Sequence, residues 1–115
     1  MWMFNGGRDT LDSYGIGLSD LSQFLDDREA LAQAFGDAVP ESHRAFLNGL
    51  AIHHREGDYL FVHAGIRPGV ALEDQSEQDL IWIRDEFTGS DADFGAIVVH
   101  GHSIRAEPEI KPNRI

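Results

Sequence analysis

Two histidine-containing segments have a composition that suits metal chemistry. In residues 59–65 (YLFVHAG) and 97–102 (IVVHGH), an apolar run ends in a histidine, and a glycine follows at once or after one residue. Neutral imidazole binds zinc, manganese and iron, and residues spaced by one, such as His100 and His102, can point to the same side of an extended chain. A lone histidine at a strand end is nevertheless more often a hydrogen-bonded structural residue. The pattern alone leaves both interpretations open.

Strand signals place these histidines at the ends of neighbouring elements. Residues 51–55 and 59–63 are β-like runs separated by a Glu-Gly-Asp turn, which predicts a hairpin. Residues 96–100 form a dense β-branched run that suits a buried strand. In sheets flanked by helices, ligands collect beyond the carboxyl ends of the strands. We therefore expect both histidine segments to meet at one edge of a sheet.

Apolar spacing predicts the helices. Residues 5–7 (NGG) suit a turn, and the region that follows is expected to be mainly helical up to Gly36, from the spacing of Leu21, Phe24, Leu25, Leu31 and Phe35. A second helix is predicted from Pro40 to about Gly49, and one short helix around residues 78–87, in which Trp82 and Phe87 are expected to be core residues. The tail from residue 107 is expected to be irregular, with a short strand near its end.

Composition narrows the classes of function. The 20 acidic residues outnumber the 9 lysines and arginines, and the formal charge of −11 would repel a nucleic-acid backbone, so no nucleic-acid partner is expected. Because the chain has no cysteine, histidines must carry any transition-metal chemistry, and a reducing cytoplasm suits the protein. No apolar run is long enough to span a membrane and no secretory signal is recognisable, so no membrane partner is expected.

Five short blocks follow one another along nearly the whole chain. They are NGG (5–7) with Thr10-Leu11 and SYG (13–15), FVHAGIRPG (61–69), LIWIRDEF (80–87), VVHGHS (98–103), and Pro108 with NRI (113–115). In this order they resemble the C-terminal motifs of bacterial serine/threonine phosphoprotein phosphatases, which belong to the calcineurin-like metallophosphoesterase superfamily. The resemblance implies an α+β fold, a partial metallophosphoesterase β-sandwich flanked by helices. Residues 1–115 would then be the C-terminal portion of a single metallophosphoesterase domain whose N-terminal half is missing.

The resemblance implies a metallophosphatase that hydrolyses a phosphoprotein or a small phosphoester. In the full-length protein, two divalent cations (manganese, iron or zinc) would lower the pKa of a bridging water that attacks phosphorus in line. His63 matches the histidine of the HAG motif and His102 that of the GH motif, both ligands of the second metal. Arg84 matches the arginine that holds the substrate phosphate. His100 has no fixed ligand role in the family and is assigned a place behind the ligands, where it would orient a ligand or tune the site.

Other interpretations of these residues stay open. Arg67 is a second candidate for contact with the phosphate, but beside Pro68-Gly69 it is equally well a loop residue. Arg84 could pair with Asp85 or Glu86 on a helix surface. Three further histidines match no motif and are interpreted as ordinary helix or hairpin residues, namely His43, His53 and His54.

The sequence also departs from the family pattern. The DxH, GDxxDRG and GNHE motifs that supply the first metal do not occur, so we expect at most one partial metal site, no activity of the isolated chain, and exposed strand edges and apolar surface. The position two residues after His102 is Ile104 rather than histidine, which favours the protein-phosphatase branch. Two alternatives remain: a dinucleoside-polyphosphate hydrolase of the same superfamily, and a non-catalytic metal-binding or interaction remnant.

Overall fold

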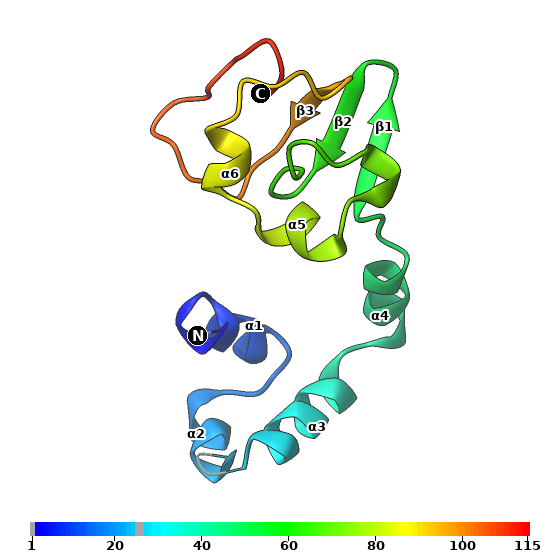
Figure 1. Cartoon of the computed structure of the whole chain (residues 1–115). Helices are drawn as coiled ribbons and strands as arrows, with labels where there is room; N and C mark the ends of the chain where they lie inside the picture. Colours follow the sequence, from blue (N-terminus) through cyan, green and yellow to red (C-terminus); the bar gives the residue numbers. More distant parts are fainter. Residues whose placement is uncertain (1, 25–26) are drawn as a thin grey trace. The chain divides into compact units, whose positions relative to one another are not determined.

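The computed structural model describes residues 2–24 and 27–115, which divide into two compact units, Met1–Leu50 and Ala51–Ile115 (Figure 1). Among the described residues the first unit contains helices, and the second contains a three-stranded mixed sheet with short helices. The α+β class expected from the sequence is therefore confirmed. Whether the sheet is part of a metallophosphoesterase sandwich, and residues 1–115 the C-terminal portion of one such domain, stays a prediction.

Short helices make up the first unit. They are η1 (Trp2–Phe4), α1 (Gly7–Ser13), α2 (Leu18–Leu21), η2 (Ser22–Phe24), α3 (Arg28–Ala38) and α4 (Glu41–Asn48). The predicted helical region and the predicted second helix after Pro40 are both confirmed, while Leu25 lies outside the described residues. The Asp27 side chain accepts a hydrogen bond of 2.9 Å from Ala30 N and so caps the start of α3. No helix in the described part of the chain is long and apolar enough to cross a membrane.

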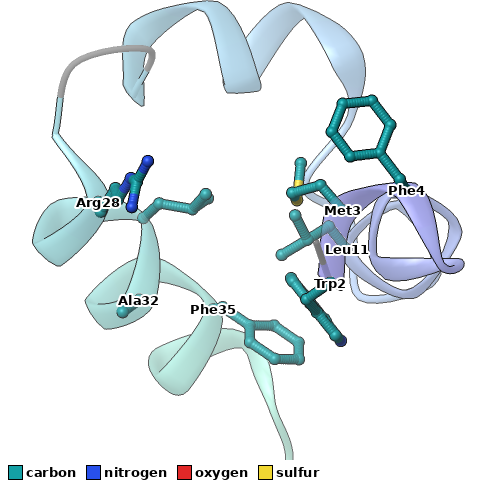
Figure 2. A pocket seen from close by; sticks show the side chains of 8 residues that line it. Trp2, Met3, Phe4, Leu11, Arg28, Ala32 and Phe35 are labelled. Carbon is teal, nitrogen blue, oxygen red and sulfur yellow. The ribbon is translucent and has the colours of Figure 1, made fainter.

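A cavity of about 570 Å³ lies among the helices of the first unit (Figure 2). Apolar side chains of η1, α1 and α3 line it, and the rings of Trp2 and Phe35 approach to 5.8 Å between centroids. Among the described lining residues, only Arg28 is charged.

The sheet of the second unit contains the three predicted strand regions. β1 (His53–Glu56) and β2 (Tyr59–Val62) form an antiparallel hairpin, and β2 pairs in parallel with β3 (Ile97–Val99), in the order β1-β2-β3 (Figure 1). The hairpin turn is one residue shorter than predicted, because Glu56 already pairs with Tyr59. Alternation along β2 buries Leu60 but leaves Tyr59 43% and Phe61 44% exposed on the other face of the sheet.

The connection from β2 to β3 carries η3 (Leu72–Asp74), α5 (Glu77–Trp82) and α6 (Asp85–Thr88). This corrects the single helix predicted around residues 78–87, because Ile83 and Arg84 separate two short helices. Arg84 has φ −133° and ψ −103°, outside the helical region. The break lets both Ile83 and Phe87 enter one core with Leu60 and Val98. Packing against the sheet thus overrides the continuous apolar pattern.

The break also decides which aromatic side chains are buried. Phe87 is completely buried, as predicted. Trp82 is 58% exposed, so its predicted place in the core was wrong. Leu80 and Ile83 are spaced by three and share the buried face of this segment, whereas Trp82 between them points elsewhere.

The tail is irregular, as predicted, apart from one β-bridge between Val98 and Arg114. Arg114 is only 1% exposed, and its guanidinium donates hydrogen bonds to the carbonyl oxygens of Thr88 and Ser90. The same guanidinium lies 5.9 Å from the centre of the Phe87 ring. Arg114 thus fastens the tail to α6 and to the core.

At Gly65, just after β2, the ring of Phe87 lies close to the backbone. The φ of Gly65 is 148°, and a β-carbon at this position would collide with the Phe87 ring. Gly69 also has a positive φ, 79°, but a β-carbon there would meet no atom within 4 Å. An alanine at Gly69 would strain the backbone only, whereas an alanine at Gly65 would both strain the backbone and clash with Phe87.

We expect Gly65→Ala to lower the free energy of unfolding by more than about 3 kcal/mol, because backbone strain and overpacking add. The matched variant Gly69→Ala should lose about 1 to 2 kcal/mol, from backbone strain alone. Urea unfolding of both variants measures the difference. Equal losses would show that Phe87 does not pack on Gly65 in solution.

Candidate metal and phosphate site

The carboxyl ends of β2 and β3 meet at one edge of the sheet, as their parallel pairing requires. Beyond the strands, Gly101 N donates a hydrogen bond of 2.9 Å to His63 O, which joins the two histidine segments. Ala64 N donates another, also 2.9 Å, to Leu80 O and brings α5 to the same edge. Three of the five sequence blocks therefore converge here.

The imidazoles of His63 and His102 face each other at this edge. His63 Nε2 lies 3.1 Å from His102 Nδ1, and the ring centroids are 4.9 Å apart. His102 has φ 58°, in the left-handed region that residues other than glycine seldom adopt. Its Nε2 is buried without a hydrogen-bond partner among the described residues. In this orientation of the His102 ring, Nδ1 faces His63 and Nε2 is covered.

The separation of these two nitrogens is compatible with shared binding of one divalent cation. Two nitrogens bound to the same cation at about 2.1 Å, with a right angle between the bonds, lie about 3.0 Å apart. Burial, followed by the charges of Arg84 and His63, lowers the pKa of His102, which favours the neutral form that binds a metal. The same spacing also suits a simple hydrogen bond between the rings. In the described part of the chain, no cluster of three or more His, Asp or Glu side chains could hold a metal ion.

Arg84 lies next to the histidine pair, in the break between α5 and α6. Its Nη1 is 3.4 Å from His102 O, to which it donates a long hydrogen bond. No ion pair joins Arg84 to Asp85 or Glu86 within the described residues, although the sequence left that pairing open. Arg84 is exposed to solvent, and its contact with the histidine segment is with the backbone oxygen of His102.

Arg67, the second candidate for phosphate contact, is engaged with carboxylates instead. Its Nε and Nη2 donate to Asp79 at 2.9 and 2.6 Å, and its Nη1 lies 3.3 Å from Glu86. These carboxylates raise the pKa of Arg67 above its ordinary value. The structure thus favours the loop role that the sequence had left open, in which Arg67 ties the loop after β2 to α5 and α6. Sequence reasoning missed Asp79, since nothing distinguished it from the many solvated acids.

His100 lies behind the pair, against the core. Its ring is perpendicular to Phe87, with 4.8 Å between centroids, and its Nδ1 is 3.0 Å from Gly101 O. Burial lowers the pKa of His100. Phe87 in turn packs on Gly65, so His100 is connected to the backbone beside His63 through a single side chain. The assigned role of His100 in orienting or tuning the site stays a prediction.

Trp82 is a neighbour of the site that the sequence analysis did not identify. Its ring is nearly perpendicular to that of His102, at 85°, with centroids 5.7 Å apart. The spacing of Leu80 and Ile83 was the signal that could have placed Trp82 on the outer face.

Comparison with known proteins gave no match to a family model, to a curated protein or to a solved structure. The interpretation of this site therefore rests on the sequence blocks and on the geometry described above.

The ion pair between Arg67 and Asp79 leads to a prediction about stability and pH. Hydrogen bonds from Arg67 and then from Ser76 hold the pKa of the Asp79 carboxyl below its ordinary value of 3.8. A carboxyl group whose pKa is lower in the folded than in the unfolded state stabilises the fold. This stabilisation is fully present above the unfolded-state pKa and is lost as the pH falls through the folded-state pKa.

We expect Asp79→Asn to melt at a lower temperature than the wild type at about pH 7, and the gap to close as the pH falls below about 4. Asp74→Asn, which removes an exposed carboxylate nearby, should show a much smaller gap at every pH. Thermal melts followed by circular dichroism measure both. A gap for Asp79→Asn that did not narrow at all between about pH 7 and about pH 2 would mean that the charge of Asp79 is not its cause.

Proposed function

We propose that this chain contributes part of the active site of a metal-dependent phosphomonoester hydrolase, similar to bacterial serine/threonine phosphoprotein phosphatases. The observation that carries the proposal is the 3.1 Å approach of His63 Nε2 to His102 Nδ1 at the carboxyl edge of the sheet. The position of the Arg84 guanidinium beside His102 adds to it. A metal-binding pair and an anion-binding group side by side are what phosphoester hydrolysis requires.

Each residue of the chain has a distinct part in this proposal. His63 and His102 would hold one divalent cation, which when bound supplies a Lewis acid and lowers the pKa of a coordinated water. Arg84 would donate two parallel hydrogen bonds to phosphate oxygens and offset their charge. His100 would keep the GH segment in register through its contact with Phe87. The first-metal ligands would come from a part of the domain that these 115 residues do not contain.

The proposed substrate is a phosphoprotein or a small phosphoester, and the proposed location is the cytoplasm. The formal charge of −11 argues against a nucleic-acid substrate, and the lack of cysteine suits a reducing compartment. A non-catalytic metal-binding role is the second candidate. It is supported by the size of the donor set, which within the described residues is two imidazoles without a third His, Asp or Glu ligand.

The metal part of the proposal can be tested by calorimetric titration of the chain with Mn²⁺. His63→Ala and His102→Ala should each weaken binding by more than about tenfold, because even the loss of an outer-sphere partner costs that much. His43→Ala is the control, since the Nδ1 of His43 already bonds the Tyr14 hydroxyl at 2.8 Å. If the two site variants bound Mn²⁺ as the wild type does, the metal assignment would be wrong.

The phosphate part is tested on the chain saturated with Mn²⁺. Arg84→Ala should weaken the binding of inorganic phosphate by about 10- to 100-fold, the range expected when hydrogen bonds to a charged group are lost. Arg105→Ala removes the same charge from an exposed position in the same unit and should change the affinity by less than about twofold. Similar losses in both variants would point to long-range attraction rather than to a phosphate site at Arg84.

A further inference from the structure

Trp82 is a large apolar side chain in an unusual place, beside the histidine pair and open to solvent. It ends α5 two residues before Arg84, and its ring stands edge-to-face with that of His102. Trp82 and Arg84 also line one hollow of about 430 Å³, together with Arg67 and the carboxylates of Asp79, Asp85 and Glu86. An aromatic surface and a guanidinium therefore face the same space.

Packing within the second unit does not account for Trp82. Leu80 and Ile83 are the residues by which this segment enters the core, while Trp82 remains 58% exposed. A solvent-exposed indole does not gain the free energy that its burial would give. Exposed aromatic groups beside polar ones are typical of binding sites. Its single aromatic contact among the described residues is with His102, a proposed metal ligand.

We propose that Trp82 is a specificity-determining residue whose indole packs against the group esterified to the phosphate, so that the site binds aryl phosphomonoesters. This inference rests on the proposed function, because Arg84 and the histidine pair must hold the phosphate. In an aryl phosphate the ring is attached directly to the ester oxygen, so a phosphate at Arg84 brings the ring close to Trp82. Aromatic rings attract one another at centroid separations of about 4.5 to 7 Å, in offset-stacked or edge-to-face geometry.

An alkyl ester would gain less binding free energy from contact with the Trp82 indole. The carbon next to the ester oxygen of phosphoserine is a single methylene group, which offers an indole little area. A cyclohexyl ester has the size of a phenyl ester but is neither planar nor aromatic. Comparison of phenyl and cyclohexyl phosphate therefore separates aromatic contact from simple apolar burial.

The test is calorimetric titration of the complete 115-residue chain, saturated with Mn²⁺, with inorganic phosphate, phenyl phosphate and cyclohexyl phosphate. The wild type should bind phenyl phosphate about three- to tenfold more tightly than cyclohexyl phosphate. Trp82→Ala should abolish this preference and leave the affinities for Mn²⁺ and inorganic phosphate within about twofold. Trp82→Phe should restore part of the preference, and Trp2→Phe, in the first unit, should leave it unchanged.

The outcomes separate this inference from the proposed function. If inorganic phosphate binds through Arg84 but the wild type shows no preference for phenyl phosphate, the inference about Trp82 is wrong and the phosphate site stands. A preference that survives in Trp82→Ala, or an equal loss of phosphate and phenyl phosphate binding in that variant, also overturns it. Failure of inorganic phosphate to bind at all would overturn both.

Discussion

The hydrogen bond from Gly101 N to His63 O is the constraint on which the rest of the site depends. Parallel strands end at the same edge of a sheet, but the loops that leave them are free to diverge. This bond prevents divergence for the first residues after β2 and β3, and His102 follows Gly101 directly. The bond from Ala64 N to Leu80 O then adds α5, whose end carries Trp82 and leads to Arg84. Two backbone contacts thus determine which side chains share the edge.

The ring of Phe87 connects this edge of the sheet to the core. Phe87 packs on Gly65, meets the ring of His100 and lies under the guanidinium of Arg114. Because Arg114 donates hydrogen bonds to the carbonyl oxygens of Thr88, at the end of α6, and of Ser90, the C-terminal tail takes part in holding the histidine segments. Residues far apart in the sequence therefore act on the site through packing rather than through contact with a ligand.

The sequence predicted the elements whose signals are local. The Glu-Gly-Asp turn and the β-branched run around Val98 indicated the hairpin and β3, and the parallel pairing then brings His63 and His102 together; their role as metal ligands stays a prediction. The break at Ile83 and Arg84 was not predictable, because no glycine or proline marks it and the core alone requires it. The Arg67 ion pair was missed for a related reason, since the acid it binds lies twelve residues away.

The charges around Arg84 affect how strongly this acidic chain would attract a phosphate. The net charge of −11 is spread along the sequence, and salt screens exposed charges beyond about 8 Å, so the nearest groups dominate. Three acids share the hollow with Arg84; Asp79 and Glu86 are paired with Arg67, whereas Asp85 has no ion pair among the described residues. Arg67 was considered from the sequence as a direct phosphate ligand. In the structure its single positive charge instead offsets part of the charge of Asp79 and Glu86, which reduces but does not remove the local repulsion that an approaching phosphate would meet.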